Sequence, residues 1–153
     1  MTLTIEGNGQ WPEAVEQLVR GLPAWFGIEQ SILRYIDAAR ALPNTAVFLD
    51  GEIVAVCLVR QHTEVACEIE LLAVRRDLHR TGLGRRLLRK VEADLRSRGI
   101  KVLQVKTFGP SGESLEYERT RAFYQALGYL PLEERTDIWG PDNPCLISVK
   151  MLA

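Results

Sequence analysis

Apolar positions in the first third of the chain repeat with helical spacing. Residues 13–21 and 28–42 each place their apolar side chains on one face of a helix. Pro12 suits the first turn of the earlier segment, and Pro43 ends the later one. The pattern predicts that two helices precede the first strands.

The spacing then changes to that of strands. Two β-rich apolar runs, Ala46–Leu49 and Ile53–Val59, flank the dipeptide Asp50-Gly51, which is typical of a tight hairpin turn. A third run, Val65–Val74, is apolar enough to predict a central strand of a sheet. These positions indicate three consecutive strands.

The second half of the chain alternates between the two patterns. A helix within residues 79–99 carries the apolar stripe Leu83, Leu87, Leu88, Val91 and Leu95, and a strand follows at 100–108. Ser114 is a suitable N-cap for a last helix over 115–127, and two final strands flank residues 139–144. The order predicts an α/β fold: one domain, residues 1–153, with a mixed sheet and helices on both faces.

Composition narrows the class of protein. The chain has 153 residues, 46% of them hydrophobic, with a formal net charge of -1, so no overall charge favours nucleic acid or membrane. Three cysteines without metal-ligand spacing indicate buried thiols and predict no metal site. Without an export signal or a membrane-spanning apolar run, we expect a cytoplasmic protein.

The start of the helix within 79–99 has an unusual charge. Residues 75–90 hold seven cations against one acid, Asp77, although the positive end of a helix dipole disfavours cations. Gly82 and Gly84 allow the backbone to turn tightly and expose its N–H groups. We interpret this segment as a phosphate-binding helix start; the alternative is a solvated basic face with incidental glycines.

Two common phosphate motifs do not fit this segment. A dinucleotide fingerprint requires a third glycine where Leu87 stands, so NAD is disfavoured. A P-loop requires Lys-Ser or Lys-Thr after the last glycine, where the chain has Arg85-Arg86, so ATP and GTP are disfavoured too.

The segment "LLAVRRDLHRTGLGRRLL" resembles the pyrophosphate signature of the GNAT superfamily of acyl-CoA-dependent N-acetyltransferases, with His79 at the position of its Gln or Arg. About 40 residues later, "AFYQALGY" resembles that family's last helix, with Tyr124 at the Tyr position; Tyr117 stands where many members have Asn. The ending "IWGPDNPCLISVK" resembles a bacterial branch of the family. The resemblance implies the GNAT-like fold, with a mostly antiparallel central sheet.

The resemblance also implies a donor, acetyl-CoA, and direct attack by an amine in a ternary complex. The implied donor-binding residues are Leu72, Ala73, Val74, His79, Arg80, Thr81, Gly82, Leu83, Gly84, Arg85 and Tyr124. Backbone N–H groups of the helix start would hold the pyrophosphate, and the strand end would pair with the pantetheine arm. Arg85, Arg86 and Arg89 lie at the correct end of the helix to meet phosphates.

The expected catalytic residues are Tyr124, Glu70 and Glu68. A phenol is protonated at neutral pH, so Tyr124 could protonate the departing thiolate; a core tyrosine is the alternative. Family members often place a carboxylate base on the strand that holds Glu70 and Glu68, which share one face; solvated carboxylates are the alternative. His62 and His79 are interpreted as exposed histidines and are not chosen as the base.

For the acceptor amine, a small molecule or a peptide, Trp25, Tyr117 and Trp139 could line the site, although packing explains the tryptophans equally well. Two rival functions stay open: a catalytically silent CoA-binding module and a nucleic-acid-binding domain, the latter disfavoured by the net charge of -1. We expect no nucleic acid or membrane partner, and edge strands of the terminal hairpin could pair in a homodimer.

Overall fold

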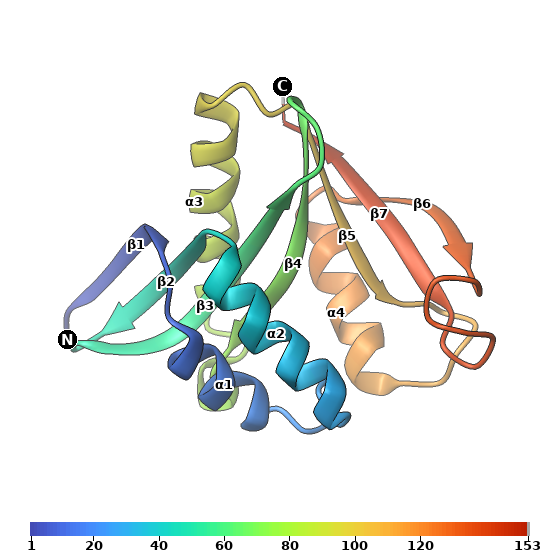
Figure 1. Cartoon of the computed structure of the whole chain (residues 1–153), viewed down its shortest axis with the longest axis horizontal. Helices are drawn as coiled ribbons and strands as arrows, with labels where there is room; N and C mark the ends of the chain where they lie inside the picture. Colours follow the sequence, from blue (N-terminus) through green and yellow to red (C-terminus); the bar gives the residue numbers. More distant parts are fainter. Residues whose placement is uncertain (153) are drawn as a thin grey trace. The chain divides into compact units, whose positions relative to one another are not determined.

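A computed structural model describes residues 1–152. Its strands form one seven-stranded sheet in the order β1-β2-β3-β4-β5-β7-β6, and β1–β2, β2–β3, β5–β7 and β6–β7 pair antiparallel (Figure 1). This confirms the predicted α/β fold class. The strands are β1 Leu3–Gly9, β2 Asn44–Leu49, β3 Glu52–Gln61, β4 Ala66–Val74, β5 Val102–Phe108, β6 Leu130–Arg135 and β7 Cys145–Met151.

The helices begin and end within a few residues of the predicted positions. They are α1 Pro12–Arg20, α2 Glu29–Ala41, α3 Leu83–Ser97 and α4 Leu115–Ala126, with a short 3-10 turn at Arg76–Leu78. The sequence pattern missed β1, the edge strand, whose residues are mostly exposed and include two glycines.

The described chain divides into two compact units. Unit 1 comprises Met1–Arg60 and Ile69–Arg98; unit 2 comprises Gln61–Glu68 and the chain from Gly99 onward. The single-domain interpretation therefore stays a prediction.

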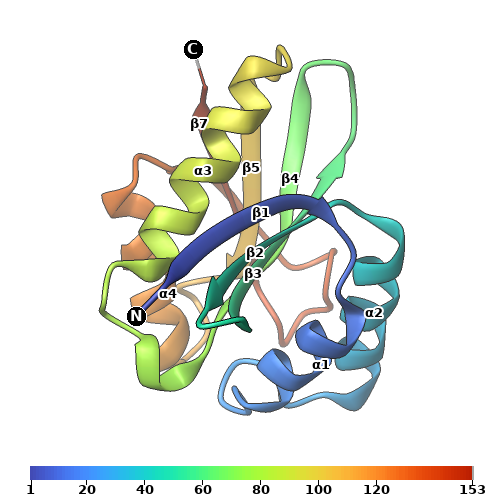
Figure 2. The ribbon, with the colours of Figure 1, turned by 90° about the vertical axis from the view of Figure 1, so that its left-hand side faces the viewer.

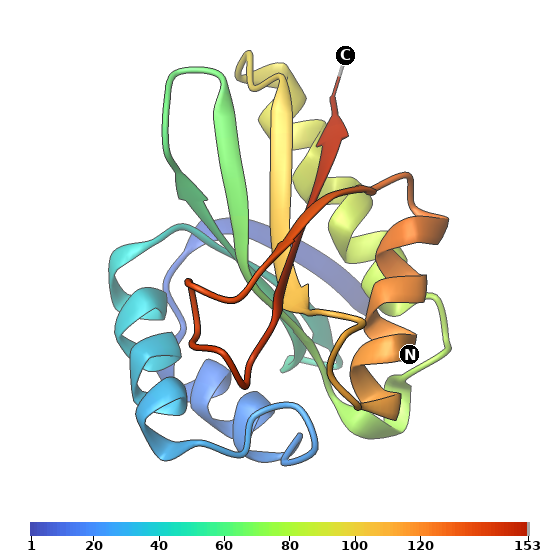
Figure 3. The same ribbon diagram turned by 90° about the vertical axis from the view of Figure 1, so that its right-hand side faces the viewer.

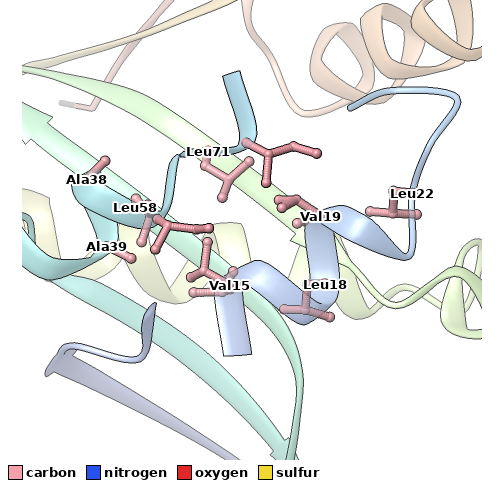
Figure 4. Packing of buried hydrophobic residues seen from close by; sticks show 12 residues of the cluster. Val15, Leu18, Val19, Leu22, Ala38, Ala39, Leu58 and Leu71 are labelled. Carbon is pink, nitrogen blue, oxygen red and sulfur yellow. The ribbon is translucent and has the colours of Figure 1, made fainter. Parts of the chain in front are cut away.

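In unit 1, both faces of the central strands are covered. One face carries a core of side chains from α1, α2, β3 and β4, among them Val15, Val19, Ala39, Leu58 and Leu71 (Figure 4). Helix α3 contacts β1 and β2, and Figure 2 shows it on the side of β2 and β3 opposite α1 and α2. The predicted stripe of α3 is buried throughout, so burial of this stripe fixes the axis of α3 on the sheet.

A buried asparagine joins three elements of unit 1. The Asn44 side chain is fully buried; its Oδ1 accepts from Trp11 N at 2.9 Å, and its Nδ2 donates to Ala39 O at 3.0 Å and Leu42 O at 2.7 Å. Trp11 is the N-cap residue of α1, and Leu42 is the C-cap residue of α2. One side chain therefore satisfies backbone groups at the start of α1 and the end of α2.

In unit 2, β7 (red) runs alongside β5 (yellow-orange), and α4 contacts β5 (Figure 3). Ser114 caps α4 as predicted, because its Oγ accepts from Tyr117 N at 3.2 Å. Gly128, at φ 95°, follows the last turn of α4 in the left-handed conformation that glycine adopts readily.

Asn44→Ala should lower the free energy of unfolding by about 2–4 kcal/mol, because one N–H and two carbonyl oxygens lose their partner in a buried position. Urea unfolding followed by circular dichroism measures the change. Asn143→Ala is the control: its exposed amide donates to Trp139 O, and its removal should cost less than about 0.5 kcal/mol. Equal losses for the two variants would contradict the structural role of Asn44.

Candidate functional site

The start of α3 has an open, positively charged end. Gly82 is the N-cap residue at φ 84°, no side chain caps the helix, and its first turn contains no acid. A Cβ at Gly82 would meet no atom within 4 Å, so the left-handed backbone, rather than crowding, requires glycine there. The first N–H groups of a helix have no partner within it. This end can therefore bind an anion.

The loop before α3 is held by its own side chains. His79 Nε2 lies 2.7 Å from Val74 O, so Nε2 carries the hydrogen and donates it. Thr81 Oγ1 donates to Leu78 O at 2.6 Å, and Arg80 adopts a left-handed φ of 63°. His79 and Thr81, both expected to bind the donor, thus use these groups to fold the loop.

The arginines around this loop differ in their pairing. Arg75 binds Asp77 at 2.7 Å, and this guanidinium lowers the pKa of the Asp77 carboxyl. Arg80, Arg85 and Arg86 are exposed, and within residues 1–152 they form no ion pair. The one acid within residues 75–90 is therefore already paired, and Arg80, Arg85 and Arg86 leave the helix start positively charged.

Trp25, expected to line the acceptor site, packs on the loop instead. Its ring meets the His79 ring edge to face, with centroids 5.4 Å apart, and the Arg76 guanidinium lies 6.0 Å from its centroid. The segment between α1 and α2 thus contacts the loop that precedes α3, an arrangement that sequence reasoning did not predict.

The two expected bases on β4 both have partners. Glu70 is bound by Arg60, with Oε2 3.1 Å from Nε. Glu68 is only 6% exposed, and its carboxylate contacts His62 Nε2 at 2.7 Å and Lys106 Nζ at 3.2 Å. The alternative of solvated carboxylates is therefore wrong for Glu68. His62, not chosen from the sequence, is held by that buried acid.

Unit 2 holds three further predicted residues, Tyr117, Tyr124 and Trp139, whereas Leu72, Ala73 and Val74 end β4 in unit 1. Tyr124 is the buried residue of α4, and its ring meets Tyr129 edge to face at 5.4 Å. Tyr117 lies against Phe108, with centroids 5.7 Å apart. Trp139 is 43% exposed in the segment between β6 and β7. Packing therefore accounts for the positions of both tyrosines, while Trp139 presents a surface to solvent.

The structure also describes the cysteines, possible metal ligands and the length of the helices. Cys57, Cys67 and Cys145 are free and buried, as predicted, and burial raises the pKa of the Cys57 thiol to about 12. In the part of the chain that the structure describes, no group of three or more His, Cys, Asp or Glu could hold a metal ion. None of the helices described is long and apolar enough to span a membrane.

Comparison with solved structures shows the same fold in several acetyltransferases. The ribosomal-protein-S18-alanine N-acetyltransferase of Escherichia coli is 18% identical, with a TM-score of 0.79 over 99% of this chain and 95% of that one. The aminoglycoside 6'-N-acetyltransferase of Enterococcus faecium is 19% identical, with a TM-score of 0.77 over 100% of this chain and 98% of that one. A GNAT family acetyltransferase of Elizabethkingia anophelis was solved with acetyl-CoA bound. It is 17% identical, with a TM-score of 0.72 over 97% of each chain.

Comparison with curated protein sequences found no match. Residues 11–129 match the family described as the Acetyltransferase (GNAT) family. The matched range includes the pyrophosphate signature at residues 71–88 and the last-helix motif at residues 122–129. The chain therefore belongs to the GNAT family of acetyltransferases.

Proposed function

We propose that this protein transfers an acetyl group from acetyl-CoA to a primary amine by direct attack of the amine on the thioester. The observation that carries the donor is the start of α3, where Gly82 takes a left-handed φ and no acid or side-chain cap occupies the first turn. Diphosphate groups bind well at such an end. The bound acetyl-CoA in the Elizabethkingia anophelis structure supports the same donor.

The geometry of the loop supports an assignment of the donor-binding residues. We assign the pyrophosphate to the backbone N–H groups of Gly82, Leu83, Gly84 and Arg85, with the exposed guanidinium of Arg80 as a further cation. His79 and Thr81 keep the loop in shape through Val74 O and Leu78 O. Leu72, Ala73 and Val74, at the end of β4, offer backbone groups to the pantetheine arm.

Tyr124 is the proposed acid. When the amine nitrogen forms its bond to the acetyl carbon, the bond from that carbon to sulfur breaks, and the thiolate needs a proton. A phenol ordinarily titrates near pH 10 and so carries its proton at neutral pH. Burial of Tyr124 against Tyr129 fixes the ring in one orientation, and a fixed donor favours transfer along a single path.

The acceptor is proposed as a small-molecule or peptide amine. One of the similar structures is an aminoglycoside acetyltransferase and another a protein-alanine acetyltransferase, so both acceptor types occur on this fold. Trp139 is exposed and offers an apolar wall, whereas Trp25 and Tyr117 already contact other rings. We therefore place the amine's first contact at Trp139.

The direct test is release of the CoA thiol, followed with a thiol reagent. Purified protein with acetyl-CoA is tested with kanamycin, with a peptide that begins with alanine, and with spermidine. Thermal stabilisation by acetyl-CoA, compared with dephospho-CoA and NADH, is measured in parallel. Amine-dependent thiol release supports the proposal. Stabilisation without release by any amine would favour the silent CoA-binding module, and the absence of both effects would overturn the donor as well.

Gly82→Ala should weaken acetyl-CoA binding about 10-fold, because a Cβ disfavours the φ of 84° that aims the first N–H groups of α3. Gly51→Ala is a matched control: Gly51 has the same φ of 84° and equally open space, but lies in the β2–β3 turn. Both changes should cost about 1 kcal/mol of stability. Calorimetric titration separates them, since only Gly82→Ala should lose affinity; unchanged affinity would remove the helix start from the donor site.

Tyr124→Phe should lower kcat about 100-fold with little change in the KM for acetyl-CoA, because the thiolate loses its acid while the ring still packs. Tyr129→Phe is the matched control, since Tyr129 is also buried and its ring contacts that of Tyr124. Its kcat should stay near that of the unaltered protein. If Tyr124→Phe also retains its kcat, Tyr124 is only a core residue.

A further inference from the structure

Unit 2 contains a cluster of three charged or titratable side chains, His62, Glu68 and Lys106, called here the His62 cluster. His62 Nε2 lies 2.7 Å from Glu68 Oε1, and Lys106 Nζ lies 3.2 Å from each Glu68 oxygen. The residues come from the turn after β3, from β4 and from β5. Three elements therefore converge on one buried carboxylate.

The contacts determine how the imidazole is protonated. A carboxylate with an ammonium group on both oxygens only accepts hydrogen bonds, so His62 Nε2 must carry a hydrogen and donate it. In the neutral ring the lone pair then lies on Nδ1, and within residues 1–152 no hydrogen bond to Nδ1 is formed. His62 is thus held in the one tautomer that leaves a proton-accepting nitrogen, as an acid does for histidine in hydrolase triads.

Accessibility separates the members of the cluster. The His62 side chain is 38% exposed, whereas that of Glu68 is only 9% exposed. A proton can therefore reach His62 from solvent or substrate more readily than it can reach Glu68. Glu68, bound by two donors, is better suited to orient the ring than to act as the base.

Other groups near the cluster do not compete as proton acceptors. Cys145, on β7, senses the charges of Lys106 and Glu68, but burial raises the pKa of its thiol, so the thiol stays protonated. Arg135 and Asp137, which also act on Cys145, bind each other at 2.6 Å. His62 is the member of this neighbourhood with both exposure and a basic nitrogen.

We propose that His62 accepts the proton that the acceptor amine loses, with Glu68 as its positioning residue and Lys106 holding Glu68; this rests on the proposed function. The amine nitrogen bonds to the acetyl carbon and the carbon–sulfur bond breaks. The amine proton passes to His62 Nδ1, and Tyr124 protonates the thiolate. His62 then gives its proton to solvent, and solvent reprotonates Tyr124. Tyr124 and the His62 cluster belong to the same unit.

The test is the pH dependence of kcat/KM for the amine that the unaltered protein accepts, measured for variants with intact thermal unfolding. His62→Gln keeps a donor for Glu68 but has no basic nitrogen. It should lower kcat/KM about 100-fold at neutral pH and abolish the acidic limb of the pH profile. Stabilisation by acetyl-CoA should not change. Added imidazole should partly restore the activity of His62→Ala, an effect that a structural role would not produce.

Glu68→Gln tests the positioning role. It removes the carboxylate that holds the His62 ring in one tautomer. The kcat should therefore fall, with little change in the KM for acetyl-CoA. Glu64→Gln, on the same turn and exposed, is the matched control and should leave both rate and limb unchanged.

The outcomes distinguish this proposal from the proposed function. If the unaltered protein acetylates an amine and His62→Gln keeps its rate and acidic limb, only the role of His62 is overturned. If Glu70→Gln abolishes the limb instead, Glu70 is the base. If the unaltered protein releases no thiol with any amine, the proposed function fails and the role of His62 fails with it.

Discussion

The unit formed by Met1–Arg60 and Ile69–Arg98 depends on one electrostatic constraint, the positive end of α3. Most helices place acids or a capping side chain there, whereas α3 begins at Gly82 with neither. The apolar stripe from Leu83 to Leu95 fixes the helix on the sheet, so the helix cannot turn this end away. No acid or side-chain cap of α3 compensates this charge, and from this we propose that the phosphates of the donor bind there.

The same unit keeps this end in place from two directions. Val74 ends β4 and accepts the His79 hydrogen bond, so the loop is fastened to the strand from which it leaves. Trp25 packs on the His79 ring. Asn44 fixes the start of α1 and the end of α2, the two helices that the segment holding Trp25 connects. His79 and Trp25, which we expected to touch ligands directly, therefore hold the loop in place. The loop in turn positions the first N–H groups of α3.

The sequence predicted the parts of this protein that follow from local spacing. Six strands, four helices, the α3 stripe and the Ser114 cap each depend on residues a few positions apart. The first strand was missed because it has only two apolar residues, Leu3 and Ile5. Its second half contains two glycines, which strands usually avoid. The His62 cluster was missed for another reason: Lys106 stands 38 residues after Glu68, and only the sheet brings them together. Spacing cannot reveal a contact made by topology.

The two histidines show how the partner of a side chain decides its chemistry. Both rings donate a hydrogen through Nε2 at 2.7 Å, His79 to a backbone carbonyl and His62 to a carboxylate. A neutral carbonyl fixes a ring but gives little support to a positive charge, whereas a buried carboxylate supports the imidazolium that proton transfer creates. His79 is accordingly suited to hold a loop. His62 has the environment of a residue that carries a proton during each turnover, although the two residues look alike in the sequence.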